Sequence, residues 1–187
     1  RAVKEVYAST FTEAARAFLR TTPYRLEEER MAVIVQKVVG RQRGEHFYPD
    51  ISGVARSHNY YPVPPVRTED GIAAVALGLG RTVAAGEPCL RFSPAHPKHL
   101  IEFSTVEDMV EHSQREFWAV RLGDDPTGER WRQGGGLVRL PLEVAEEHGP
   151  LEWVGSTYSP ENNAIYDGLA RDGIRLVSFA PILKQDA

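Results

Sequence analysis

Residues 31–40 read Met31-Ala-Val-Ile-Val-Gln36-Lys-Val-Val39-Gly40, an apolar run that carries one amide side chain near its middle. Two further segments follow along the chain, Ser52-Gly53-Val54-Ala55-Arg56-Ser57 and Gly71-Ile-Ala-Ala-Val-Ala-Leu-Gly78-Leu79-Gly80-Arg81. All three are rich in apolar residues and are punctuated by glycine, the residue that permits sharp turns and close backbone approach. These segments decide the fold class that we expect.

The rest of the chain alternates between helical and strand patterns. Helical spacing of apolar residues predicts a helix or helix pair over residues 2–20 and another helix over residues 105–118. Strand patterns cover residues 31–39, 51–57, 72–77, 137–143, 154–158 and 174–179, and residues 46–50 read as a loop. Together these elements predict an α+β fold with a mostly antiparallel sheet and flanking helices.

Composition limits the function classes. The net charge of −4 and the pI near 5.9 disfavour nucleic-acid binding, which normally needs a basic excess. No apolar run approaches the roughly 20 residues of a membrane span, so we expect neither nucleic acid nor membrane as a partner. The single cysteine, Cys89, excludes an internal disulfide and fits a reducing, cytoplasmic location. The absence of an initial Met suggests a boundary inside a longer protein.

The three segments together resemble the nucleotide-binding region of the phosphoenolpyruvate synthase and pyruvate phosphate dikinase family, an ATP-grasp module. The resemblance covers residues 3–97 and rests on Val35-Gln36-Lys37-Val38-Val39, Ser52-Gly53-Val54-Ala55 and Gly78-Leu79-Gly80. It implies an ATP-grasp-like fold, of which this chain is an incomplete fragment. We therefore expect residues 1–122 to be the core of the nucleotide-binding region. Residues 123–136 are then a glycine-rich loop, and residues 137–187 a β-rich continuation of the same domain.

The resemblance also implies which residues bind the nucleotide. In the family, the strand that contains Gln36 supplies the adenine contact, and the backbone of Val38 and Val39 continues it. An amide in an apolar strand needs hydrogen-bond partners, although Gln36 facing solvent from an edge strand is the alternative from the residues alone. The remaining candidates are Ser52, Arg56, Gly78 and Gly80, with Thr82, Glu87 and Arg91 as a second tier.

Four positions depart from the family pattern. Arg56 stands where the family has an aromatic residue, and Ser57 where it has Thr. Leu77 stands where it has Trp, and Arg81 where it has Glu. A guanidinium at position 56 could pair with phosphates through its planar fork, or it could be a surface side chain. The replacement of an acid by Arg81 puts in doubt any role that needs a carboxylate there.

The resemblance implies part of the ATP-binding domain of a larger phosphotransferase. Such an enzyme phosphorylates a carrier histidine and then converts pyruvate to phosphoenolpyruvate, using histidine-carrier and pyruvate-binding barrel domains of the same polypeptide. We expect ATP and Mg²⁺ as cofactors, with the Mg²⁺ ligands outside this chain, and no catalytic residue can be named. The six histidines show no metal-binding spacing, so we expect no metal site. The isolated chain should be inactive. The alternative is a non-catalytic nucleotide-binding or regulatory module that kept the fold.

Overall fold

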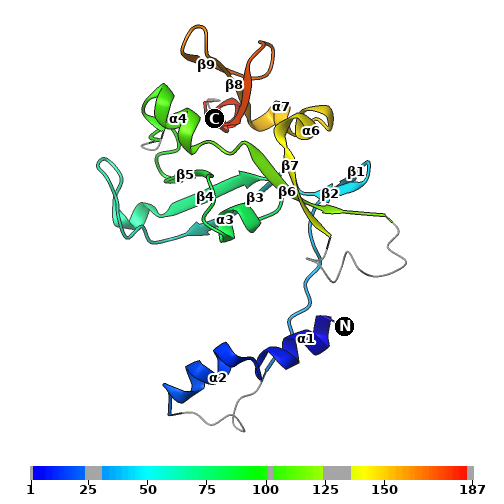
Figure 1. Cartoon of the computed structure of the whole chain (residues 1–187). Helices are drawn as coiled ribbons and strands as arrows, with labels where there is room; N and C mark the ends of the chain where they lie inside the picture. Colours follow the sequence, from blue (N-terminus) through cyan, green and yellow to red (C-terminus); the bar gives the residue numbers. More distant parts are fainter. Residues whose placement is uncertain (1, 24–30, 101–102, 124–135, 185–187) are drawn as a thin grey trace. The chain divides into compact units, whose positions relative to one another are not determined.

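The computed structural model describes residues 2–23, 31–100, 103–123 and 136–184 (Figure 1). The chain divides into two compact units, residues 1–38 and residues 39–187, which are considered separately below. Most of the glycine-rich loop predicted at residues 123–136 lies outside the described residues.

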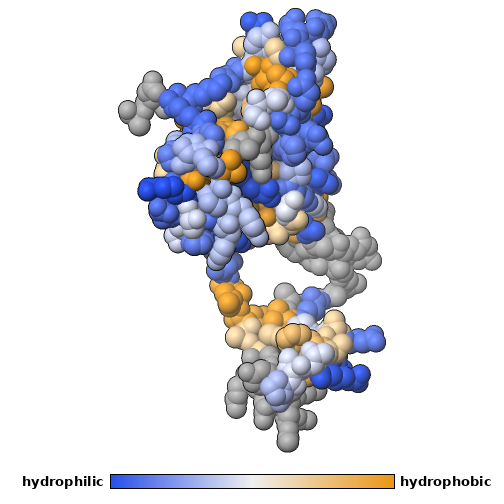
Figure 2. Space-filling model, turned by 90° about the vertical axis from the view of Figure 1, so that its left-hand side faces the viewer, coloured by the Kyte–Doolittle hydropathy of each residue, from blue (hydrophilic) through white to orange (hydrophobic). Residues whose placement is uncertain are grey.

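The N-terminal unit contains the helix pair that the apolar spacing predicts. Helix α1 spans Ala2–Ser9 and helix α2 spans Glu13–Arg20. Thr12 is the N-cap of α2, and its hydroxyl accepts a hydrogen bond from the Ala15 amide at 3.3 Å. Several large apolar side chains of this unit are exposed, and Figure 2 shows apolar surface on the smaller body in the lower part of the view. They are Val3, Val6, Tyr7, Phe11 and Phe18.

The prediction of a strand over residues 31–39 is wrong. Residues 31–40 form no helix or strand, and Ile34 and Val35 are more than four-fifths exposed. β-branched content favours an extended backbone, but a strand exists only where a neighbouring strand pairs with its N–H and C=O groups. No described residue supplies that ladder.

The larger unit is built from three antiparallel sheets, each of three or four strands (Figure 1). The first has the order β1 (Arg41–Arg43), β2 (His46–Tyr48), β6 (Glu116–Arg121) and β7 (Leu137–Pro141). The second has the order β3 (Ile51–Arg56), β4 (Ile72–Leu77) and β5 (Leu90–Phe92). The third has the order β10 (Ile174–Val177), β8 (Gly155–Ser159) and β9 (Ala164–Asp167). The predicted α+β class and antiparallel pairing are confirmed.

Short helices connect the sheets. They are α3 (Arg81–Ala84), α4 (Val106–His112), α6 (Leu142–Glu147), α7 (Leu151–Val154) and α8 (Ala180–Leu183), with a 3₁₀ turn, η2, at Thr68–Asp70. Helix α4 starts as its sequence predicts, because the Thr105 hydroxyl accepts from the Asp108 amide at 3.0 Å.

Two sequence predictions in this unit are wrong. The helix expected to reach residue 118 ends at His112, and Phe117 and Ala119 instead alternate toward the core from strand β6. Residues 46–48, expected in a loop, form β2, which pairs with β1 across a turn at Gly44. Gly44 has a φ of +56°, a conformation open to glycine, and this permits the tight hairpin.

One core joins all three sheets. Its fully buried members include Tyr48, Leu77, Phe117, Leu151 and Val177, which come from the first half of the unit and from its C-terminal part. Residues 137–184 therefore pack as a continuation of the structure that begins at residue 39.

The buried side chain of Gln114 links this core to the C-terminal end of β4. Its Oε1 accepts from the Leu77 amide at 2.8 Å, and its Nε2 donates to the carbonyls of Leu77 and Glu116, both at 2.9 Å. Its own carbonyl accepts from the Val177 amide at 3.2 Å, next to β8 in the third sheet. One amide residue thus contacts all three sheets.

Candidate nucleotide-binding site

One face of the β3–β4–β5 sheet carries the candidate site. The register places Arg56 opposite Ile72, and Val54 opposite Ala74, on adjacent strands. Ala74 in turn lies opposite Arg91 of β5. Because side chains alternate between the two faces of a strand, these five residues lie on the same face.

A pocket of about 330 Å³ lies on this face and is partly covered by helix α3. It is lined by Val54, Arg56, Ile72, Ala74, Val83, Ala84, Cys89 and Arg91. The floor is apolar, and the only charged lining residues are the two arginines. Within the described part of the chain, Arg56 is exposed and makes no ion pair with a carboxylate. We call this cavity the Arg56–Arg91 pocket.

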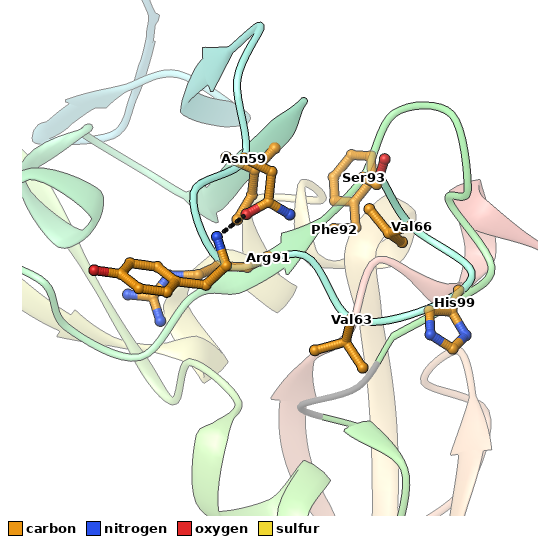
Figure 3. A pocket seen from close by; sticks show the side chains of 9 residues that line it. Asn59, Val63, Val66, Arg91, Phe92, Ser93 and His99 are labelled. Atoms are coloured by element: carbon orange, nitrogen blue, oxygen red, sulfur yellow. Dashed lines mark hydrogen bonds between the residues drawn. The ribbon is translucent and has the colours of Figure 1, made fainter. Parts of the chain in front are cut away.

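A second cavity, of about 210 Å³, adjoins the Arg56–Arg91 pocket because both are lined by Ile72 and Arg91 (Figure 3). Its other lining side chains are mainly apolar or aromatic, among them Val63, Val66 and Phe92. The polar side chain of Asn59 also lines it, and its Oδ1 accepts from the Tyr61 amide at 3.1 Å. Together the two cavities offer an apolar surface beside two cationic groups.

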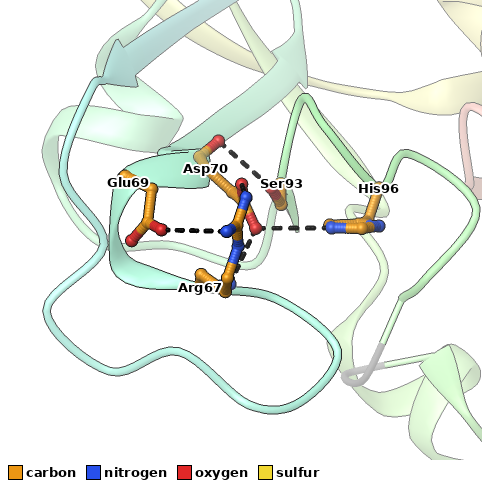
Figure 4. A network of polar contacts seen from close by, with 5 residues as sticks. All are labelled: Arg67, Glu69, Asp70, Ser93 and His96. Atoms are coloured by element: carbon orange, nitrogen blue, oxygen red, sulfur yellow. Dashed lines mark hydrogen bonds and ion pairs between the residues drawn. The ribbon is translucent and has the colours of Figure 1, made fainter.

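A polar network around Asp70 fixes the loop that leads into β4. Arg67 and His96 approach the Asp70 carboxylate from opposite sides, and His96 Nε2 lies 3.3 Å from Oδ2 (Figure 4). The Ser93 hydroxyl donates to the Asp70 carbonyl at 3.2 Å. The hydrogen bond from the Arg67 amide, together with the Arg67 charge, lowers the pKa of Asp70. The network ties the wall of the second cavity to the segment that follows β5.

Two of the predicted residues, Ser52 and Gly80, lie side by side. A Cβ atom built at Gly80 would lie 3.8 Å from the Oγ of Ser52. The Ser52 Oγ is buried and has no hydrogen-bond partner within the described residues. The antiparallel pairing of β3 with β4 thus brings the two motifs together at the start of α3, with Ser52 on the same face as Arg56.

Gly78 has a structural reason to be glycine. Its φ is +81°, and a Cβ there would lie 2.7 Å from the Trp118 carbonyl oxygen and 2.9 Å from Phe117. The next amide, of Leu79, donates to that same carbonyl at 2.9 Å. The turn therefore packs directly against β6, and a role for Gly78 in binding phosphate stays a prediction.

The lining of this pocket does not include the predicted adenine-side residues. Gln36 and Val38 belong to the N-terminal unit, and Val39 begins the larger unit. All three are exposed, with Val39 at 77%. The groove predicted between Gln36 and the strand that starts at Ile51 stays a prediction.

Arg81, which stands where the resembled family has an acid, stacks on an aromatic side chain. Its guanidinium carbon lies 4.3 Å from the ring centre of Trp118 in β6. The Trp118 indole N–H donates to Glu87 at 3.1 Å. Glu87, which follows helix α3, therefore places a carboxylate at the same indole ring on which Arg81 stacks.

Of the second-tier candidates, only Arg91 lies in the pocket, while Thr82 and Glu87 line a separate cavity. Sequence reasoning missed Asn59 and the pairing of Arg91 with Arg56 across β4. Residue spacing gives no signal for the arginine pair, because it depends on the registers of β3 and β5 against β4.

The described ranges contain neither a metal-binding cluster nor a membrane-spanning helix. No group of three His, Cys, Asp or Glu side chains in residues 2–23, 31–100, 103–123 and 136–184 is arranged to hold a metal ion. No helix in those ranges is long and apolar enough to cross a membrane.

The fold and pocket define an α+β protein of antiparallel sheets with an apolar, arginine-flanked cavity on one sheet. A family model described as "Pyruvate phosphate dikinase, AMP/ATP-binding domain" matches residues 1–120, well over half of the chain. The chain belongs to this family. Neither the curated proteins nor the solved structures gave a significant match.

Proposed function

We propose that the larger unit binds the phosphates of AMP or ATP in the Arg56–Arg91 pocket. The observation that carries this is the pair of guanidinium groups on one sheet face, above an apolar floor and without a carboxylate in the lining. Guanidinium groups bind phosphate oxygens through two parallel N–H donors. The neighbouring cavity offers apolar and aromatic surface on which a base or ribose could rest.

We further propose that Gln36 and the backbone of Val38 and Val39 contribute the adenine contact that the family resemblance implies. On this proposal the chain is part of the ATP-binding domain of a cytoplasmic phosphoenolpyruvate synthase or pyruvate phosphate dikinase-like enzyme. The carrier-histidine domain, the pyruvate-binding domain and the Mg²⁺ ligands belong to other parts of that enzyme. Phosphoryl transfer needs metal and cationic groups around the β- and γ-phosphates, so this chain alone should bind nucleotide weakly and transfer nothing.

The second candidate is a nucleotide-binding module without catalysis. One observation favours it, because Arg81 replaces the family's acid and its guanidinium is engaged on Trp118. An enzyme that needed a carboxylate at position 81 would have lost it.

Calorimetric titration of the 187-residue chain with ATP, with and without Mg²⁺, tests the proposal. We expect weak, magnesium-independent binding that Arg56→Gln weakens about 5- to 10-fold, the effect of losing one charge-assisted contact. Arg171→Gln is the matched control, because Arg171 is an exposed arginine that stacks on Tyr166 in a different sheet. Equal affinities for Arg56→Gln and Arg171→Gln would show that the pocket is not the phosphate site.

A pyruvate-dependent ATP consumption assay on the same chain separates the two candidates from a complete enzyme. Turnover, or tight binding that requires Mg²⁺, would mean that the catalytic site is complete within these 187 residues. That result would contradict the fragment interpretation.

A further inference from the structure

The cavity of about 210 Å³ beside the Arg56–Arg91 pocket is mainly apolar, but one buried amide side chain, that of Asn59, lines it. Asn59 is only 9% exposed. Its backbone N–H donates to the Thr68 carbonyl at 2.9 Å, and its side-chain Oδ1 accepts from the Tyr61 amide at 3.1 Å. The backbone and the side chain of Asn59 are therefore both held in place before any ligand arrives, which lowers the entropic cost of binding one.

The contact with Tyr61 decides which atom of the Asn59 amide faces the cavity. A backbone N–H can only donate, so the atom that it meets is the oxygen, and Nδ2 with its two N–H donors takes the other position. In Figure 3, Nδ2 points toward the side of the cavity where Phe92 and Val66 lie. It makes no hydrogen bond within the described residues, and it is not one of the enclosed polar atoms, as the Ser52 hydroxyl is. Asn59 thus presents a free donor to the cavity.

The other polar groups of the lining are engaged or enclosed. The Ser93 hydroxyl donates to the Asp70 carbonyl at 3.2 Å, and the Nε2 atom of His99 is enclosed. Arg91 also lines the Arg56–Arg91 pocket, where the proposed function assigns it to phosphate. Apolar walls with one directed, uncharged donor favour a flat, uncharged ring that carries an acceptor atom. Such a ring adds no charge beside the ion pairs of Asp70.

We propose that this cavity binds the base of a purine nucleotide, and that Asn59 Nδ2 donates a hydrogen bond to one of its ring nitrogens. The inference rests on the proposed function, because the cavity shares Ile72 and Arg91 with the proposed phosphate pocket. A nucleotide bound across both cavities has its phosphates at the arginines and its base beside Asn59. This contact is separate from the one proposed for Gln36, which belongs to the N-terminal unit.

The first experiment titrates the whole 187-residue chain with two uncharged nucleosides in ligand-observed NMR. Purine riboside carries ring-nitrogen acceptors, whereas indole riboside has the same bicyclic shape without them. We expect purine riboside to bind at least about 5-fold more tightly, although indole is the more apolar ring, because only purine can accept from Asn59. Equal or tighter binding of indole riboside, or no measurable binding of either nucleoside, would overturn the proposal.

Asn59→Asp then tests the residue itself. The substitution keeps an oxygen for the Tyr61 amide but replaces the Nδ2 donor by a second oxygen, so purine riboside should bind at least about 10-fold more weakly and lose its advantage over indole riboside. Asn162→Asp is the matched control, because it adds the same charge at an exposed asparagine of the third sheet. Unchanged affinity for purine riboside in Asn59→Asp would refute the assignment. If that variant fails to fold, Val63→Asp decides by the same criterion, since Val63 lines the cavity and is 48% exposed.

Ribose 5-phosphate separates this inference from the phosphate proposal. Arg56→Gln should weaken the binding of ribose 5-phosphate about 5- to 10-fold and leave that of purine riboside within about twofold. If Arg56→Gln changes neither affinity, the phosphate site is refuted and the base site stands on the two nucleosides. If Arg56→Gln weakens ribose 5-phosphate but Asn59→Asp leaves purine riboside unchanged, the phosphate site stands and the base site is refuted.

Discussion

Replacement of Gln114 by methionine tests whether one side chain holds the sheets of the larger unit together. Methionine has a similar length and is unbranched, so Gln114→Met keeps most of the packing and removes the amide. Three hydrogen bonds of 2.8–2.9 Å are lost, and both backbone groups of Leu77 lose their amide partner. Leu77 is completely buried, so water cannot replace that partner without opening the core.

The expected magnitude follows from those contacts. A net hydrogen bond contributes about 1 kcal/mol, and an unsatisfied buried backbone group costs about 1–3 kcal/mol. Gln114→Met should therefore lower the free energy of unfolding by about 3 kcal/mol, as part of the loss is offset by the apolar side chain. For a chain of this size, that corresponds to a midpoint roughly 6–12 °C lower.

Urea denaturation followed by tryptophan fluorescence measures this change, because all three tryptophans lie in the sequence of the larger unit. The matched control is Gln42→Met in β1, where the exposed side chain donates one hydrogen bond to the Gly44 carbonyl. We expect that control to cost only a few tenths of a kcal/mol, the usual range for surface changes. A Gln114→Met variant within about 0.5 kcal/mol of Gln42→Met would refute the reasoning, because it would leave no net stabilisation for the three buried contacts.

Three further changes have defined outcomes. Gly78→Ala should lower the free energy of unfolding by more than about 2 kcal/mol in urea denaturation, since the added Cβ would meet the Trp118 carbonyl. Gly86→Ala is the comparison. Gly86 also has a positive φ, +70°, but nothing lies within 4 Å of a Cβ there, so this change should cost only about 1 kcal/mol. Glu146→Gln should lower the free energy of unfolding by about 1 kcal/mol at neutral pH, because it weakens the bidentate ion pair with Arg175, whose hydrogen bonds are 2.7 and 2.8 Å long. A decrease of less than about 0.3 kcal/mol would contradict this. The pKa of Asp70 is lowered in the folded chain. The charged Asp70 carboxylate therefore stabilises the fold above its unfolded pKa near 4, and this stabilisation is lost as the pH falls through the lower folded pKa. Asp70→Asn should therefore flatten the acid limb of a stability–pH profile, and an unchanged limb would show that the Arg67 contacts do not act in solution.

The sequence predicts those elements whose stability is local. The helix pair of the N-terminal unit, the Thr105 cap and strand β4 all follow from spacing, capping and β-branched content over a few residues. The wrong predictions share a different cause. The segment 31–39 has the composition of a strand without a described partner, and β2 pairs with β6, about seventy residues further along the chain. No pattern within a short window shows whether a distant strand supplies the ladder.

The same distinction separates two glutamines, Gln36 and Gln114. The sequence favours Gln36 as a site residue because an amide in an apolar run needs partners, whereas in the structure its side chain is exposed. The amide with three buried partners is Gln114, in a short polar link between a helix and a strand, where local pattern gives it no significance. Gln114 binds the last residue of β4, the strand that sets Arg56 and Arg91 on opposite sides of the pocket floor. The strand beneath the proposed phosphate site is thus anchored by a contact between Leu77 and Gln114, which lie thirty-seven residues apart in the sequence. Any loss of nucleotide binding in Gln114→Met should accordingly follow the loss of folded protein, whereas Arg56→Gln should weaken binding in a chain that remains folded.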